Sequence, residues 1–186
     1  MIWVAADLMF GAWYRRQHEA TLERMGAAPV SGREIMPASL AMGEPIGTLE
    51  IPRVGLSGVV VEGDEDSILD HAIGHLPDTP LPWHAGNSAL AGHRDSVFRR
   101  LNGVRLGDVL RLVTPYGTFH YRIRETVIVE PDDLRVLDQT PVSTLTLISC
   151  YPFNYLGPAP ARFIVRAERI LTPSAGLSAM LGLPPH

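Results

Sequence analysis

Cys150 is the only cysteine of the chain, and its thiol is the residue with the clearest chemical potential. It ends the segment STLTLISC and stands directly before Tyr151 and Pro152. Because one thiol cannot form an internal disulfide, Cys150 is either a small buried apolar side chain or a reactive group. Strand alternation places it with Thr146 and Ile148 on one face, at a strand end where a rigid scaffold can present a nucleophile to a groove.

His93 lies in the segment ALAGHRD and can exchange a proton with a thiol, because imidazole titrates near neutral pH. A turn histidine without a chemical role is the ordinary alternative, and the rival candidates are His71, His75, His84 and His120. No pair of histidines has HExxH spacing, and with one cysteine a zinc site would need ligands from distant segments. The sequence therefore does not favour a metal site.

Arg162 begins the segment RFIVRAERI, in which Phe163 and Val165 share an apolar face and Arg162 and Arg166 lie opposite. An arginine that points into a groove can donate to the oxyanion of a tetrahedral intermediate or orient a carbonyl group. A solvated charge on an edge strand is the alternative, and Arg166 competes for the role because it shares the face. Together, a thiol, an imidazole and a guanidinium suit acyl transfer.

The composition excludes several classes of function. All 16 basic residues are arginine, which excludes a Ser-Lys dyad, a lysine Schiff base and a phosphate-loop lysine. The net charge of -4 and the lack of a basic stripe argue against a nucleic-acid partner. With 186 residues, 46% of them hydrophobic, the chain fits one globular domain with short extensions.

The elements that must position these three side chains are short β-type segments from Ile46 onward. The predicted strands are GTLEI, GVVVEG, NSALAGH, DVLRLVTP, TFHYRIRETVIV, STLTLISC and RFIVRAERI. Pro115, Tyr116 and Gly117 form a predicted hairpin turn, and SVFRRL and DDLRVL are predicted to be brief helices. Many short strands with one or two short helices predict a mostly β fold that forms a closed or nearly closed barrel.

Three segments flank the predicted barrel. Residues 1–16 begin with an apolar run shorter than a membrane span, which indicates a truncated membrane anchor or a signal-like segment, with an amphipathic surface helix as the alternative. Residues 17–45 form a polar, proline-containing tether, and residues 171–186 an apolar tail broken by prolines. The barrel itself is predicted over residues 46–170.

The order of these segments resembles the sortase family. GHRD is followed by the cysteine of TLISC, 57 residues after His93, and Arg162 follows 12 residues later. The resemblance covers roughly residues 46–170, including IGTLEIPRVGLSGVVVEG, GNSALAGHRDSVFRRL, LTLISCYPF and PARFIVRAERI. The run CYPF with GPAPARFIV is most similar to class D sortases and their relatives in Gram-negative bacteria.

This resemblance implies a closed eight-stranded β-barrel and a cysteine transpeptidase. Such an enzyme cleaves a C-terminal sorting signal, commonly of the LPXTG kind, on an exported protein and transfers it to an amine of the cell wall or of a protein. By this resemblance Cys150 forms the thioacyl enzyme, Arg162 stabilises the oxyanion and His93 protonates the leaving amine. It also implies a membrane anchor in the N-terminal segment and a barrel on the extracytoplasmic side of the cell membrane. The residues predicted to bind the substrate are Asn87, Ala91, Thr146, Ile148, Ser149 and Tyr151.

Two departures from the family pattern concern the groove. The usual TLxTC is TLISC here, so Ser149 keeps the hydroxyl of the family's threonine and loses a methyl group. Trp83 and His84 are bulkier than the residues expected at their positions. No cofactor is predicted; calcium would have to bind the acidic run within residues 62–66, a pattern more typical of a solvated turn.

Three other functions stay open. A non-catalytic β-barrel binding module, or a degenerate sortase, would carry an inert Cys150, whereas a catalytic thiol would alkylate in the folded protein with dependence on His93. An L,D-transpeptidase is disfavoured because its SHGCxR signature places an arginine two residues after the cysteine, where this chain has Pro152. A hydrolytic cysteine protease differs only in that water resolves the thioester.

Overall fold

The alternating segments after Ile46 form one sheet that closes on itself. The computed structural model describes residues 36–155 and 157–171. Its strands follow the barrel order β1-β2-β3-β4-β7-β8-β6-β5. Their bounds are β1 Pro45–Ile51, β2 Leu56–Glu62, β3 Ile73–His75, β4 Asn87–Gly92, β5 Val109–Thr114, β6 Gly117–Val129, β7 Thr144–Tyr151 and β8 Ala161–Ile170. The prediction of a closed eight-stranded barrel is confirmed.

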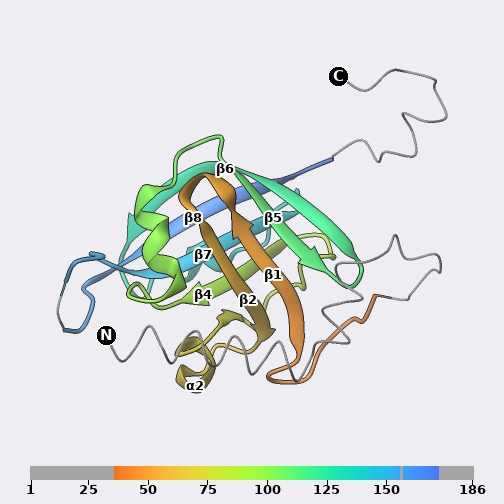
Figure 1. Cartoon of the computed structure of the whole chain (residues 1–186), viewed down its shortest axis with the longest axis horizontal. Helices are drawn as coiled ribbons and strands as arrows, with labels where there is room; N and C mark the ends of the chain where they lie inside the picture. Colours follow the sequence, from red (N-terminus) through yellow and green to blue (C-terminus); the bar gives the residue numbers. More distant parts are fainter. Residues whose placement is uncertain (1–35, 156, 172–186) are drawn as a thin grey trace.

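Two parallel pairings interrupt an otherwise antiparallel barrel. β2 pairs with β3 and β4 pairs with β7 in parallel, and β1 closes the barrel against β5 with Leu49 opposite Leu112. Figure 1 shows β1 and β2 crossing in front of β4, β7 and β8. The strand β3 was not among the predicted segments, because three residues are too short to display an alternating pattern.

The core fills the barrel from the alternate residues of each strand. In β7, Leu145 and Leu147 are fully buried in the main core cluster, and in β8 Val165 and Ala167 join them. A fully buried leucine contributes about 1.5–3 kcal/mol of hydrophobic free energy, so this inward face fixes which side of each strand points outward. The outward side of β7 carries Cys150, as the sequence predicts.

The helical segments of the described residues are short and lie between strands. They are η1 Pro52–Val54, α2 Asp66–Leu69, η2 Val97–Gly103 and η3 Leu134–Leu137. The two predicted helices correspond to η2 and η3, both of which have 3-10 geometry; α2 was not predicted. Asp133 caps η3 by accepting from the backbone of Arg135, whereas the hydroxyl of Ser96 donates to the carbonyl of His93 and caps nothing.

The predicted hairpin turn lies between β5 and β6. Thr114 is paired with Gly117, so Pro115 and Tyr116 alone connect the two strands. The predicted anchor-like segment 1–16, most of the tether and residues 172–186 of the tail lie outside the described residues. Within residues 36–155 and 157–171, no helix has the length and apolar character needed to cross a membrane.

Candidate active site

Three strand ends meet at one edge of the barrel. β7 and β8 are antiparallel, and Cys150 near the end of β7 is paired directly with Arg162 near the start of β8. β4 runs parallel to β7 with Gly92 beside Ser149, so His93 leaves the sheet next to Cys150. A Cβ atom on Gly92 would lie 2.7 Å from the ring of Phe98, which explains why a glycine precedes His93. Pairing thus brings together residues that are far apart in the sequence.

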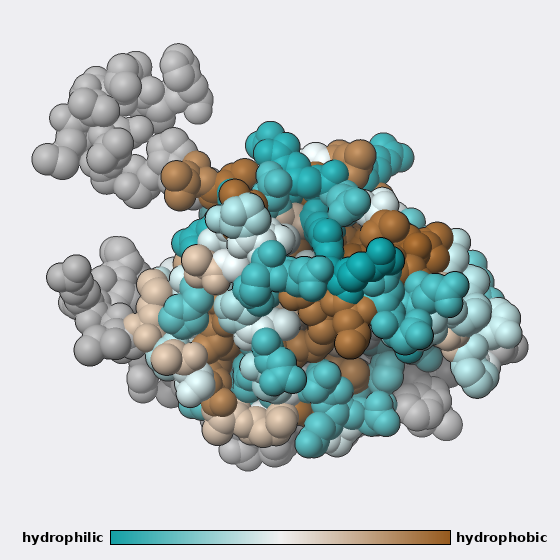
Figure 2. Space-filling view, turned by 180° about the vertical axis from the view of Figure 1, so that it is seen from behind, coloured by the Kyte–Doolittle hydropathy of each residue, from teal (hydrophilic) through white to brown (hydrophobic). Residues whose placement is uncertain are grey.

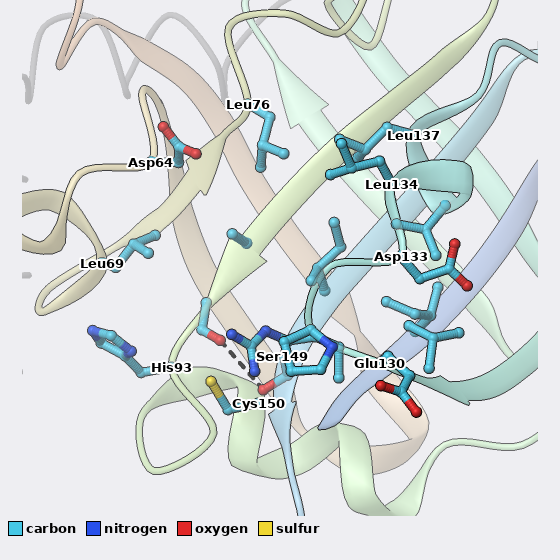
Figure 3. Close-up of a pocket in the computed structure, with 18 of the residues that line it drawn as sticks. Asp64, Leu69, Leu76, His93, Glu130, Asp133, Leu134, Leu137, Ser149 and Cys150 are labelled. Carbon is cyan, nitrogen blue, oxygen red and sulfur yellow. Dashed lines mark hydrogen bonds between the residues drawn. The ribbon is translucent and has the colours of Figure 1, made fainter. Parts of the chain in front are cut away.

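The three side chains line one pocket of about 420 Å³ on the outer side of the barrel. Its lining residues are Asp64, Asp66, Leu69, Leu76, Ala91, Gly92, His93, Val129, Glu130, Pro131, Asp133, Leu134, Val136, Leu137, Ile148, Ser149, Cys150, Arg162 and Ile164. Figure 3 shows Cys150 and His93 on one side, with Glu130, Asp133 and Leu134 across from them. In Figure 2, apolar residues gather near the centre of the face opposite to that of Figure 1, bordered by polar ones.

Cys150 and His93 are both partly exposed in this pocket. The cysteine is a free thiol of intermediate burial, and the imidazole of His93 is 34% exposed. The Nε2 atom of His93 lies 3.5 Å from a carboxylate oxygen of Asp70, which follows α2 and is itself 55% exposed. Both groups are therefore accessible to a substrate that enters from solvent.

Arg162 differs from Arg166, its competitor on the same face of β8. The guanidinium of Arg162 donates to the carbonyls of Ala159 and Ala161, at 3.4 and 3.1 Å, and none of the ion pairs among the described residues involves it. Arg166 contacts the carboxylate of Glu125 at 3.6 Å and does not line the pocket. Arg162 thus keeps its charge beside Cys150 without a carboxylate partner.

Ser149 fixes the position of the strand end that carries the thiol. Its side chain is 1% exposed, and its hydroxyl donates to the carbonyl of Gly92 at 3.2 Å. This bond joins β7 to β4 one residue before both Cys150 and His93. The hydroxyl that Ser149 shares with the threonine of the usual TLxTC pattern therefore makes a hydrogen bond between β7 and β4.

The residues predicted to bind the substrate fall into two groups. Ala91, Ile148 and Ser149 line the pocket, and their contact with a substrate stays a prediction. The other three, Asn87, Thr146 and Tyr151, are not among its lining residues. Tyr151 instead packs its ring against Phe153 and Phe163, while Asn87 and Thr146 are buried and bonded to each other.

The wall of the pocket opposite Cys150 was not predicted residue by residue. It consists of residues 129–137, which include η3, and it contributes Leu134, Val136 and Leu137 as apolar surface. Asp133 lies on this wall, and a hydrogen bond from Arg135 holds the pKa of its carboxyl below the ordinary value. The only hint in the sequence was the apolar residues of DDLRVL after Pro131. An irregular loop has no periodicity, so the sequence could not show that these residues line the pocket.

Two of the rival histidines, His75 and His84, contact other groups than the thiol, and the acidic run within residues 62–66 is divided between the interior and the pocket. His75 is 1% exposed and contacts Glu62 at 2.8 Å, and the ring of His84 contacts the carbonyl of Pro37. Glu62 is therefore buried, whereas Asp64 and Asp66 line the pocket. Among the described residues, no three side chains of His, Cys, Asp or Glu converge in a way that could hold a metal ion.

Known proteins with similar sequences and structures agree on one family. The Sortase domain family matches residues 49–170. Sortase D of Bacillus subtilis is 41% identical over 129 residues, which cover 69% of this chain and 65% of that protein. Sortase A of Streptococcus agalactiae is 28% identical, with 66% of this chain and 52% of that protein covered. The chain thus spans between half and two thirds of the length of these relatives.

Solved structures show the same fold. A Clostridium perfringens Sortase D5 transpeptidase superposes with a TM-score of 0.65 at 30% identity, over 72% of this chain and 83% of that one. Sortase C1 of Streptococcus suis gives a TM-score of 0.65 at 28% identity, over 71% of this chain and 76% of that one. The overall barrel fold is thus common to this group of structures.

Proposed function

Since the chain belongs to the sortase family, we propose that it is a cysteine transpeptidase that cleaves the sorting signal of an exported protein. The observation that carries this proposal is the pairing of Cys150 with Arg162, with His93 at the same edge and all three in one pocket. A nucleophile, a proton-transfer group and a cation are the groups that exchange of an amide requires.

In the first half-reaction the Cys150 thiolate attacks the scissile carbonyl carbon, and the carbonyl oxygen becomes an oxyanion. The guanidinium of Arg162, opposite Cys150 in the sheet, donates to that oxyanion. Collapse of the tetrahedral intermediate breaks the carbon–nitrogen bond, and imidazolium His93 gives its proton to the leaving amine. The products are a thioester on Cys150 and the released C-terminal fragment.

In the second half-reaction an acceptor amine attacks the thioester carbonyl. Neutral His93 takes the proton that the amine loses, and the Cys150 sulfur leaves as thiolate, so both groups return to their starting forms. No oxidation or reduction occurs in either step. The thiol divides one difficult amide exchange into two easier acyl transfers, and both use the same oxyanion site.

The pocket walls support a peptide substrate with an apolar part. Leu69 and Leu76 on one side and Leu134 and Leu137 on the other give a groove with hydrophobic walls beside the reactive thiol. We infer a sorting signal of the LPXTG kind, an acceptor amine of the cell wall or of a protein, and a class D type of enzyme. Anchoring at the cell membrane through residues 1–16, with the barrel on the extracytoplasmic side, is part of the same proposal.

The test is intact-mass spectrometry of the full chain mixed with a pool of LPXTG-like peptides and a small amine. Wild type should gain the mass of an acyl fragment and convert it into an amine-capped peptide, and Cys150→Ala should do neither. A hydrolysed peptide in place of the capped one would indicate a protease. A thiol that forms no adduct and resists alkylation in the folded protein would contradict the proposal and favour a binding module.

A further inference from the structure

The η3 wall, residues 129–137, forms the side of the pocket across from Cys150 but belongs to no strand apart from Val129. A 3-10 helix of four residues is not stable alone, because so short a segment makes too few internal hydrogen bonds. Contacts with the barrel must therefore fix its position. The strongest of these contacts comes from a residue that does not line the pocket.

Asn87 of β4 holds the end of the η3 wall through its side-chain amide. The Nδ2 atom donates to the carbonyl of Val136 at 2.9 Å and to that of Asp138 at 3.1 Å. Asn87 is 0% exposed, and its bond to Val136 is buried, whereas its bond to the exposed Asp138 is only partly buried. An amide nitrogen has two hydrogens; one is used on the carbonyl of Val136 in the wall and the other on that of Asp138, the residue that follows the wall.

Thr146 fixes the orientation of that amide. Its hydroxyl donates to Oδ1 of Asn87 at 2.7 Å, and its residue is also 0% exposed. Because a hydroxyl donor is satisfied only by the carbonyl end of the amide, this bond directs the NH₂ end towards Val136 and Asp138. Thr146 lies in β7, four residues before Cys150 on the same face.

Arg166 provides a second, more exposed contact with the same wall. Its Nη2 atom donates to the carbonyl of Arg135 at 3.1 Å, and its side chain is 31% exposed. Since hydrogen bonds in contact with water contribute less than buried ones, Asn87 makes the dominant contact. Strand β4, which ends at Gly92 directly before His93, therefore also carries the residue that bonds to the η3 wall.

We propose that Asn87, oriented by Thr146, is a positioning residue that holds the η3 wall in the place where it binds the substrate peptide. This inference rests on the proposed function and deepens it. Asn87 touches none of the reacting groups, so its loss should weaken peptide binding while the Cys150 chemistry continues. A residue important only for the stability of the barrel would lower the amount of folded enzyme instead.

The test compares Asn87→Ala with Ser88→Ala, its neighbour on the same strand. Ser88 is 2% exposed, and its hydroxyl has no hydrogen-bond partner among the described residues, so its removal is a matched control. A second pair tests the orienting hydroxyl: Thr146→Val removes it at nearly constant volume, and Thr146→Ser keeps it but loses a methyl group. Three properties are measured: peptide turnover, alkylation of Cys150 by iodoacetamide, and hydrogen exchange of amides 134–138.

We expect Asn87→Ala to raise KM about tenfold with kcat changed less than about threefold, because one buried and one partly buried hydrogen bond to the loop are lost. Thr146→Val should shift KM in the same direction, while Thr146→Ser and Ser88→Ala should match wild type. Hydrogen exchange should accelerate in residues 134–138 but not in β7, and alkylation of the thiol should keep its rate.

An unchanged KM in Asn87→Ala, or faster exchange throughout the barrel, would overturn the inference. If the wild-type enzyme processes no sorting peptide, that result contradicts the proposed function and not the role of Asn87. The exchange rates of residues 134–138 then still decide whether Asn87 and Thr146 hold the wall, because that measurement needs no substrate.

Discussion

Two histidines of this barrel lie near a carboxylate, and their surroundings are opposite. His93 is 34% exposed and lies 3.5 Å from Asp70, which is more exposed still. His75 is 1% exposed and lies 2.8 Å from Glu62, whose side chain is 8% exposed. Both residues follow a glycine at the end of a strand, so the chain is similar at the two positions.

The two imidazole rings differ in whether a nitrogen is still available to contact a ligand. The second nitrogen of His75 contacts the carbonyl of Pro80 and the hydroxyl of Thr79, so its ring is fully bonded inside the protein. His93 has one long contact and an open side facing the thiol pocket. A histidine that stabilises the fold has its partners already, whereas one that transfers protons must keep room for a substrate.

Replacing His93 should have the largest effect on turnover. His93→Ala removes the group that we propose to give and take the proton, and general acid–base catalysis typically contributes about 100–10,000-fold. The expected loss of kcat/KM is of that size, with an unchanged denaturant midpoint because the imidazole is partly exposed. Peptide turnover and denaturant unfolding of the same preparation check this; wild-type turnover in the variant would remove His93 from the mechanism.

The two arginines of β8 should likewise differ in how much their replacement lowers kcat. Arg162→Ala should lower kcat about 100–1000-fold, because removal of one oxyanion donor has an effect of that order. Arg166→Ala should change kcat little, since Arg166 contacts Glu125 and the wall rather than the thiol. Steady-state kinetics of the two variants side by side is the measurement, and equal losses of kcat would contradict the assignment of Arg162.

His75→Ala should act on stability and not on chemistry. Removing one partner of a buried hydrogen-bonded pair leaves the other unsatisfied, which typically destabilises a protein by about 1–3 kcal/mol. The free energy of unfolding should fall by that amount, while the fraction that remains folded turns over peptide at the normal rate. Active-site titration with a thiol reagent gives that fraction. A variant of normal stability with lost turnover would reverse the roles given to the two histidines.

Asp70→Asn should have the smallest effect of the series. The contact with His93 is 3.5 Å long and exposed to solvent on both sides, and ion pairs of this kind contribute little. We expect kcat to change less than about fivefold, with a sensitivity to salt that disappears in the variant. Turnover at low and high ionic strength measures both the change in kcat and its sensitivity to salt. A loss of kcat comparable to that of His93→Ala would make Asp70 an essential partner of His93.

The sequence predicts most of the barrel but not the difference between these histidines. Alternation in β7 and β8 determines the inward and outward faces, because Leu145 and Val165 must be buried and period two then turns Cys150 and Arg162 outward. The pairing of Cys150 with Arg162 depends on register, which only the folded sheet displays.

Loops and long-range partners account for what the sequence did not predict. The η3 wall has no periodicity, so its place in the pocket could not be read from residues 129–137. Asn87 and Thr146 are predicted from the sequence to bind the substrate, but both are buried, bonded to each other and not among the residues that line the pocket. The carboxylate that His75 contacts belongs to Glu62, which lies 13 residues away in the sequence.

The parallel ladder between β4 and β7 has a consequence for the order in which the molecule matures. As the chain is made from its N-terminus, His93 emerges long before Cys150, and Arg162 emerges last of the three. β7 lies between β4 and β8 in the barrel, so the thiol gains both neighbours only when the final strand is in place. A chain without β8 would carry the thiol without Arg162, so under the proposed mechanism efficient thioester formation would require the complete barrel.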